Sequence, residues 1–558
     1  MLRRDLTPLA AALLLSACAL LDRPAAEPAA GATPLPPIPA HALQAHYRFL
    51  ADDLLAGRMS GEPGHEIAAR YVASQFRQIG LTPAGGADPE QGEDAYLRPV
   101  PLLAGQLDIA ASQLVLHGVP GGDTLRFRDD YVVYANLGGA QRQVRAPLVF
   151  AGHGVVAPSL GHDDYAGLDV AGKIVVTFPR APKSFPADER AFYSSVRRKA
   201  REAAARGAVG MLSIRSDYAR KRYAWADTAR NAGTQPTMRW TDAAGQPADY
   251  TPQIRASATL ADHVAPRLFV DAPTDLETLL AAEAAGEPLP RFPLGVEASI
   301  RTQTTLSALR SPNVVARLPG QDPALAGEHM VLVAHLDHLG VGAPVDGDAI
   351  YNGAYDNAMG IALLIETARA LAASGTRRSV LFAAVTAEER GLLGSHYLAR
   401  NPPAEVERMV AAITLDMPLL LFPMREVIGF GAEHSNLDEF VRAAAGAEDI
   451  ALAPDPMPDE VLFIRSDHYS FVREGVPGLF FFPGFASADP DVDGEAQVYG
   501  HLATHYHKPS DDLSRPVHWP SAERFARINA RLARGIANSE QPPQWVPGNF
   551  FAAQFVRD

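Results

Sequence analysis

Cysteine is almost absent from this chain of 558 residues, where Cys18 is the only one. A single thiol cannot form an intramolecular disulfide, so the stability of the fold must come from packing. Any metal site in the body of the protein must use oxygen and imidazole ligands, because no thiolate remains to bind a metal.

Positive charge is scarce relative to negative charge. The chain has 50 Lys and Arg against 64 Asp and Glu, which gives a formal net charge of −14. This balance argues against sequence-independent binding to the phosphates of nucleic acids. Apolar residues make up 47% of the chain, which is ordinary for a globular protein. The length predicts two or three domains.

The N-terminus lacks an apolar run long enough to span a bilayer comfortably. Arg3 and Arg4 precede a short apolar stretch that ends in Leu-Ser-Ala-Cys at Cys18. This stretch resembles a bacterial lipobox, and the alternative is an ordinary cleaved export signal. The resemblance implies a signal peptide over residues 1–18, lipidation of Cys18 and tethering in the cell envelope. Ala19 favours the outer membrane. Residues 19–40, rich in Ala and Pro, are interpreted as a tether.

Beyond the tether, the sequence divides into four stretches. Residues 41–107 have helical periodicity and are assigned to the N-terminal part of a catalytic domain. Residues 108–295 contain short β-like runs and one clear helix, which predicts an inserted β-rich domain with a sheet of its own. Residues 296–540 alternate buried strands with helices, so we expect an α/β fold with a mixed, mostly parallel sheet flanked by helices. Residues 541–558 are expected to form an irregular tail.

Acidic and imidazole side chains follow three of the expected strands. His335 and Asp337 follow the strand expected at 330–334. Glu388 and Glu389 follow the strand at 380–385, and Asp416 follows the strand at 410–415. Because ligands of open α/β sheets gather at the carboxyl ends of the strands, we expect these side chains to lie together. One such carboxylate is more often a helix cap, but three successive strands with this ending indicate a site for zinc, cobalt or manganese.

Six short motifs occur in an order that resembles the co-catalytic zinc exopeptidases of peptidase family M28, which include secreted bacterial aminopeptidases and glutamate carboxypeptidases. They begin at His335, Asn352, Glu388, Leu415, Arg465 and Tyr506. The resemblance covers about residues 40–105 and 296–540. The inserted stretch resembles, more loosely, a protease-associated domain. Together these resemblances imply a zinc-peptidase fold and peptides as substrates.

The resemblance also implies a role for each residue of the motifs. His335, Asp356 and Asp416 would hold one Zn²⁺ ion, and Asp356, Glu389 and His507 would hold a second. Glu388 would be the general base, and Tyr506 would polarise the scissile carbonyl. Asp337 would orient His335, whereas Arg465 and Asp511 would lie near the site. His338, His468, His501 and His505 are assigned to packing or to the outer shell of the site. A cis peptide bond is expected between Asp356 and Asn357.

Several alternatives accompany this interpretation. A metallo-β-lactamase-type enzyme is rejected, because it needs a histidine where Val333 stands. A carboxypeptidase or dipeptidase of the same family, a one-zinc glutaminyl cyclase and a non-catalytic binding homologue stay open. An aminopeptidase is favoured over a carboxypeptidase, because Arg465 is the only basic residue placed near the site. Arg390 is expected to begin a helix and face away. The sequence does not indicate an oligomeric state.

Overall fold

The computed structural model describes residues 34–86, 95–119, 124–222, 224–230 and 232–556. Cys18, the expected signal segment and most of the expected tether lie outside the described residues. No helix within the described ranges is both long and apolar enough to cross a membrane.

The strands expected at 330–334, 380–385 and 410–415 are all present, and a fourth strand lies beside them. They are β12 (Glu328–His335), β15 (Ser379–Val385), β16 (Arg408–Leu415) and β19 (Gly478–Pro483). They pair in parallel in the order β19-β16-β12-β15. Antiparallel neighbours flank them, β11 (Arg291–Leu318) beside β15 and β17 (Glu426–Phe430) beside β19. The short β18 (Ala451–Ala453) pairs with β17. The expected mixed, mostly parallel sheet is therefore confirmed.

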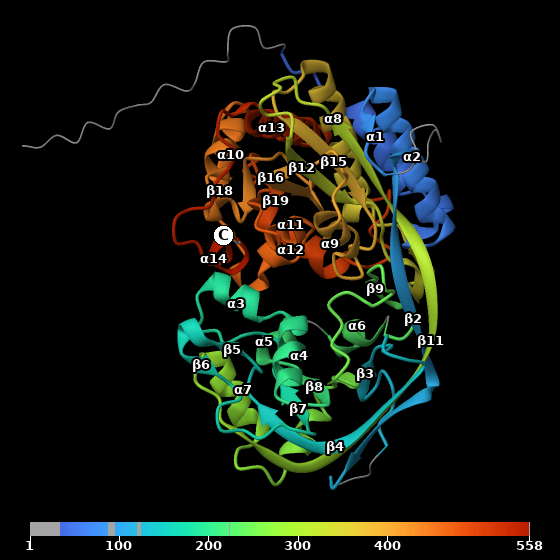
Figure 1. Ribbon diagram of the computed structural model, residues 1–558, viewed down its shortest axis with the longest axis vertical. Helices are drawn as coiled ribbons and strands as arrows, with labels where there is room; N and C mark the ends of the chain where they lie inside the picture. The colour runs from blue at the N-terminus through green and yellow to red at the C-terminus, as the bar shows by residue number, and fades with distance from the viewer. Residues whose placement is uncertain (1–33, 87–94, 120–123, 223, 231, 557–558) are drawn as a thin grey trace, which may run out of the picture. The chain divides into compact units, whose positions relative to one another are not determined.

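Helices cover both faces of this sheet (Figure 1). One face packs against α1 (Ala40–Leu50), α2 (Pro63–Ile79), α8 (Met359–Ser374), α10 (Leu437–Gly446) and α13 (Trp519–Asn538). The other packs against α9 (Leu393–Arg400) and α11 (His468–Val472). Side chains alternate along β12 as the strand period requires, with Leu332 in the first core and Val331 and Val333 in the second. Both faces of β12 are buried, which is typical of a central parallel strand.

Two long antiparallel strands join the catalytic part to the inserted stretch. β2 (Leu97–His117) pairs with β11 over most of its length, and Figure 1 shows them as adjacent long arrows. Residues 314–318 of β11 pair with β15, and residues 291–303 of the same strand pair with β4 (Gln141–Ala151). The strand pairing is therefore continuous, and the expectation that the inserted stretch has its own sheet is wrong. The reason is that β11 is long enough to serve both parts.

The inserted stretch is more helical than expected. Its strands continue from β4 through β7 (Ile174–Thr177), β8 (Gly210–Ile214), β10 (Ala256–Leu260) and β3 (Tyr131–Val133), and β9 (Thr237–Trp240) pairs with β2. Its helices are α3 (Ala187–Tyr193), α4 (Val196–Ala205), α5 (Asp217–Arg222), α6 (Trp225–Arg230) and α7 (Leu276–Ala285). Only α4 was expected. The six or seven residues of α3, α5 and α6 are too few to display a helical period, whereas α7, with ten residues, was missed.

The inserted stretch keeps a hydrophobic core of its own. This core includes Leu114, Phe150, Val176 and Leu260 and is a separate cluster from the one beneath α8. The C-terminal tail also differs from expectation, because α14 (Phe550–Phe555) is a regular helix. Its Phe551 is fully buried against Phe463.

Candidate metal centre

The expected site residues converge at the carboxyl edge of the parallel strands. His335 is the last residue of β12, Glu389 follows β15, and Asp416 follows β16. Asp356 lies just before α8, and His507 follows α12 (Gly494–Thr504). Because β12, β15 and β16 are parallel neighbours, their last residues open onto the same space, as the sequence predicts.

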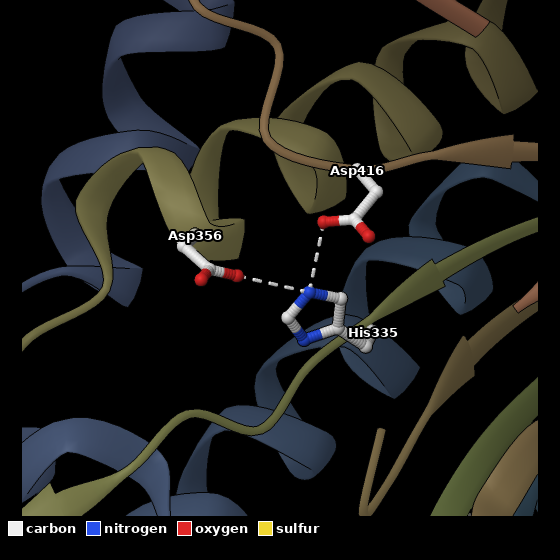
Figure 2. A group of neighbouring side chains, drawn as sticks. All are labelled: His335, Asp356 and Asp416. Carbon is white, nitrogen blue, oxygen red and sulfur yellow. Dashed lines mark hydrogen bonds and ion pairs between the residues drawn. The ribbon is translucent and has the colours of Figure 1, made fainter. Parts of the chain in front are cut away.

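His335 lies between two carboxylates in the first cluster (Figure 2). Its Nε2 atom is 3.1 Å from Asp356 Oδ1 and 3.0 Å from Asp416 Oδ1. All three side chains are buried. One nitrogen and two carboxylate oxygens this close together, with the three ligand atoms within 4.8 Å of one another, can hold one metal ion.

A second cluster uses the other oxygen of Asp356. His507 Nε2 lies 3.3 Å from Asp356 Oδ2 and 3.2 Å from Glu389 Oε2. Asp356 thus turns Oδ1 toward His335 and Oδ2 toward His507. This is the geometry that a carboxylate needs in order to bridge two metal ions.

His338 also reaches the second cluster, although the sequence placed it in packing or the outer shell. Its Nδ1 is 2.7 Å from Glu389 Oε1 and 3.9 Å from Asp356 Oδ2. Neither ring nitrogen of His338, nor Glu389 Oε1, has a hydrogen-bond partner among the described residues. Buried polar atoms that converge without hydrogen bonding fit a cation held between them. The signal was present in the sequence, three residues after His335.

Main-chain and hydroxyl contacts hold the clustered side chains in place. Asp511 accepts hydrogen bonds from the N–H groups of Tyr355 and Asp356, both at 3.0 Å. The hydroxyl of Ser466, whose role the sequence did not reveal, donates to Asp416 Oδ2 at 2.7 Å. The peptide bond between Asp356 and Asn357 is cis, which confirms that expectation.

Asn357 ties the Asp356 segment to the Asp416 segment. Its Nδ2 donates to the carbonyl of Leu415 at 2.9 Å, and its Oδ1 accepts from Met417 N–H at 3.2 Å. The two carboxylates on either side of His335 therefore keep a fixed separation.

Asp337 contacts His335, as the sequence suggested, but it does so through its main chain rather than its carboxylate. The main-chain carbonyl of Asp337 contacts His335 Nδ1 at 3.0 Å. Its carboxylate Oδ1 instead accepts a hydrogen bond from Glu388 N–H at 3.0 Å. Asp337 therefore positions the imidazole with its backbone and the Glu388 loop with its side chain.

The N-terminal segment hydrogen-bonds to the loops that carry the site residues. Arg58 is buried, and its guanidinium donates to the carbonyls of Leu336, Asn352 and Gly353. Ser60 Oγ accepts from the N–H of Ala387 at 2.8 Å. Residues 41–107 are thus built into the site region.

Burial and close charges shift the acid–base properties of the cluster. Burial alone would lower the pKa of His507, but Glu389 and Asp356 outweigh it and raise that pKa to about 10. Burial also works against the charge of Asp356, yet the surrounding histidines hold its pKa well below the usual range. The pKa of Glu388 is raised well above its usual value by burial and by the neighbouring carboxylates. The site thus contains two kinds of carboxylate. Asp356 is paired with imidazoles and has a lowered pKa, whereas Glu388 is not paired with one and has a raised pKa.

A cavity of about 960 Å³ opens beside the second cluster. Glu389, Tyr506 and His507 line it, and the Tyr506 and His507 rings stack with centroids 3.8 Å apart. Arg465 lines it too and pairs with Glu460 at 3.2 Å. Arg390 lies in a turn rather than a helix and lines the cavity, so the expectation that it faces away is wrong. Gln235 of the inserted stretch accepts a hydrogen bond from its guanidinium and holds it there.

The remaining histidines of the motifs lie outside the two clusters. His501 packs edge-on against Tyr355, and His505 hydrogen-bonds to Ser510 Oγ at 2.9 Å. His468 is buried beside Phe463. The packing assigned to these three agrees with their contacts.

The donors present fit zinc. Imidazole nitrogens and carboxylate oxygens without thiolate, buried at the edge of a rigid sheet, form a ligand set that Zn²⁺ accepts. The fold and these clusters together describe an α/β protein with a candidate metal centre. Residues 313–533, which include every residue of the two clusters, match peptidase family M28.

Two curated relatives are similar to the chain in sequence, and one solved structure is similar to it in fold. The chain is 34% identical over 234 residues to leupeptin-inactivating enzyme 1 of Streptomyces exfoliatus, covering 39% of this chain and 47% of that protein. It is 36% identical over 188 residues to aminopeptidase YwaD of Bacillus subtilis (strain 168), covering 32% and 37%. The match thus spans less than half the length of either curated relative. The solved aminopeptidase from Aneurinibacillus sp. strain AM-1 shares the fold, with a TM-score of 0.52, 20% identity and coverage of 91% of this chain and 95% of that one.

Proposed function

We propose that the chain is a zinc-dependent aminopeptidase that binds two metal ions and removes residues from the free N-termini of peptides. The observation that carries the proposal is Asp356, which turns one carboxylate oxygen to each of the two clusters. The names of the relatives, which include aminopeptidases, support the same reaction class.

The residues of the first cluster would be the ligands of one metal, and Glu389 and His507 would complete the second with the shared Asp356. When bound, such a pair of ions lowers the pKa of a shared water and polarises the substrate carbonyl. The family match without thiolate ligands supports zinc; cobalt or manganese would fit the same donors.

Glu388 would act as the general base. It is beside the clusters, its pKa is raised, and no ion pair with the site histidines involves it among the described contacts. A carboxylate that is not committed to a metal can take a proton from water and pass it to the leaving amine. Tyr506, on the cavity wall beside His507, would donate a hydrogen bond to the developing oxyanion.

The direction of attack follows from the charges nearest the clusters. The α-ammonium group of a peptide would be attracted to the carboxylates of Glu388, Glu389 and Asp416, which lie in or beside the two clusters. A free N-terminus held there would place the first peptide bond close to Glu388, the proposed general base.

Two measurements test the proposal. A pair of otherwise identical peptides, one N-acetylated and one C-amidated, separates the directions: the amidated peptide should be cleaved and the acetylated one spared. The reverse result would make the enzyme a carboxypeptidase. Metal analysis of the purified chain should give two ions per chain; one ion, with cyclisation of an N-terminal glutamine peptide, would favour a glutaminyl cyclase.

A further inference from the structure

The cavity beside the metal clusters is built by two parts of the chain. Its lining includes Tyr506 and His507 from the catalytic part and residues between Tyr134 and Ser257 from the inserted stretch. Its volume of about 960 Å³ lies in the range that encloses a small ligand. The cube root of that volume is roughly 10 Å, which is the length of about three extended residues.

The two parts contribute different chemistry to the lining. The catalytic part contributes apolar side chains, namely Met417, Phe430, Leu462, Phe480 and Phe482. The inserted stretch contributes arginines, namely Arg197, Arg222, Arg230 and Arg239, and Arg390 adjoins them. A group of apolar side chains from the catalytic part and a group of arginines, most of them from the inserted stretch, therefore line the same cavity.

Some of these arginines have acidic partners of their own. Arg230 pairs with Asp227, and Arg222 lies 3.7 Å from Glu460, which Arg465 also contacts. These pairs balance the charge on that part of the lining.

The positive charge around Asp249 is not balanced. Asp249 Oδ2 lies 2.9 Å from Arg473 and 3.8 Å from Arg197, and Arg239 is also within its electrostatic reach. Three guanidinium groups thus share one carboxylate. Burial and the neighbouring arginines, Arg239 first, lower the pKa of Arg197 to about 9, which reports the same excess of positive charge.

Arg390 adds a hydrogen-bond donor that is not used. Its Nη1 donates to Gln235 Oε1, whereas its Nη2 is buried and has no hydrogen-bond partner among the described residues. A buried, unpartnered nitrogen of a charged group is costly unless a ligand satisfies it. The basic wall, defined as Arg197, Arg239 and Arg390, therefore has more positive charge than Asp249 balances and one guanidinium nitrogen free to donate.

We propose that the preferred substrates are short peptides of about two to four residues, whose free C-terminal carboxylate binds to the basic wall while an apolar N-terminal side chain packs against the apolar part of the lining around Phe480 and Phe482. The proposal rests on the aminopeptidase function above. It adds a preferred length of the substrate and the recognition of its C-terminal end. A guanidinium binds a carboxylate in a fork of two hydrogen bonds, which gives both affinity and orientation. Longer peptides cannot place their carboxylate in the cavity and lose this contact.

The experiment compares three probes of the same N-terminal residue with the zinc-loaded enzyme. They are Leu-Ala-Ala with a free carboxylate, the same peptide as its C-terminal amide, and a Leu-Ala peptide of eight residues with a free carboxylate. We expect kcat/KM for the short free acid to exceed that of the amide and of the long peptide by about tenfold or more, chiefly through KM.

Variants locate the effect. Arg239→Gln should reduce the acid-to-amide ratio of kcat/KM toward one, and Arg239→Lys should restore part of it. Arg145→Gln is the matched control, because Arg145 also belongs to the inserted stretch but pairs with Glu297 on the exposed side of β4. That control should keep the wild-type ratio. Arg197→Gln provides a second test should Arg239→Gln fail to fold.

The outcomes separate this inference from the proposed function. Leu-p-nitroanilide, which has no carboxylate, reports aminopeptidase activity alone. Its cleavage together with an acid-to-amide ratio near one in the wild type would overturn the role of the basic wall and leave the aminopeptidase intact. If no probe is cleaved, the proposed function fails, and binding of the acid and the amide to the zinc-loaded protein by calorimetry still decides the inference. Equal affinity for the two would overturn it.

Discussion

At the scale of single residues, the neighbours Glu388 and Glu389 have different surroundings. Glu389 places one carboxylate oxygen 3.2 Å from His507 Nε2, and His338 lies beside the other oxygen. Glu388 makes no ion pair with a histidine among the described residues, and its N–H donates a hydrogen bond to the carboxylate of Asp337. Adjacent residues on a turn point in different directions, so one can bind metal while the other remains available as a base.

Replacement of the two glutamates should therefore have different effects. Glu388→Gln should keep its full metal content but slow turnover by about 10²–10⁴-fold, as expected for a lost general base. Glu389→Gln should lose one metal ion, because an amide oxygen is a weaker ligand than a carboxylate. Metal analysis and steady-state kinetics on both variants provide the measurement. Loss of metal in Glu388→Gln, with retention in Glu389→Gln, would mean that the roles are reversed.

The raised pKa of His507 predicts a second effect, on metal binding. The pKa of about 10 means that His507 carries a proton at pH 7 in the metal-free protein, and a metal must displace it. The affinity for zinc should therefore rise with pH toward about 10. Calorimetric titration with zinc at pH 7, in buffers of different ionisation enthalpy, should detect proton release.

The same shift also affects the metal-free fold. The folded pKa of His507 exceeds its unfolded value of 6.5, so its contribution to stability is present below pH 6.5 and is lost as the pH rises to about 10. A His507→Ala variant is the control for both measurements, and it should release fewer protons. An unchanged number of released protons would contradict the assignment of His507 to the second metal.

At the scale of the elements, the sequence predicts the centre of the site better than its edges. Residues such as His335 and Asp416 are predictable, because a buried strand that ends in a metal-binding side chain combines two strong local signals. The direction in which Asp337 points is not predictable, since its backbone and its carboxylate serve different neighbours. Arg390 shows the same limit: its position depends on Gln235, which is 155 residues away in the chain.

The long strands show why the sheet of the inserted stretch could not be predicted from the sequence. Its own core was predictable from its apolar runs, but β11 pairs with β15 at one end and β4 at the other. A sequence does not reveal how far a strand continues into a second set of partners, because both pairings use the same alternation of side chains.

An ion pair between the two parts predicts a pH dependence. Asp249 of the inserted stretch lies 2.9 Å from Arg473, which follows α11. Burial opposes its charge, but Arg473, His396 and Arg197 outweigh burial and lower the pKa of Asp249 to about 2, below its usual 3.8. Its contribution to stability, of about 2 kcal/mol, is therefore present above about pH 4 and lost as the pH falls toward 2.

Asp249→Asn should lower the free energy of unfolding by about that amount at pH 7 and by little at pH 2. Denaturant unfolding at the two pH values is the measurement. Asp438→Asn, in an exposed pair with Arg442, is the control and should change stability by less than about 1 kcal/mol at either pH. An equal loss for Asp249→Asn at both pH values would mean that packing rather than charge explains it.

At the scale of the whole molecule, the N-terminal segment predicts where the protein resides. The Leu-Ser-Ala-Cys ending at Cys18 resembles a lipobox, so we propose a lipid-anchored protein of the cell envelope. Cys18→Ser should release the protein from the membrane fraction or leave it unprocessed. Ser16→Thr is a milder control within the same segment. Unchanged fractionation of Cys18→Ser would exclude the lipid anchor.

The two hydrophobic cores predict how the molecule unfolds when metal is removed. All the residues of the metal clusters belong to the catalytic part, whose core lies beneath α8, and none belongs to the inserted core around Phe150 and Leu260. A ligand that binds only the folded state stabilises it by RT ln(1 + [L]/Kd), which is about 4 kcal/mol at a thousand times Kd. Only the catalytic core should receive that stabilisation directly.

Calorimetry with and without a chelator therefore should show one transition that moves to lower temperature on metal removal and one that does not. Added zinc should restore the first, and His335→Ala should make it insensitive to the chelator. The alternative result is a single transition, and it could arise because β2 and β11 run through both parts. If these strands transmit stability across the whole sheet, a single transition will shift as a unit, and the two cores will be one cooperative structure rather than two.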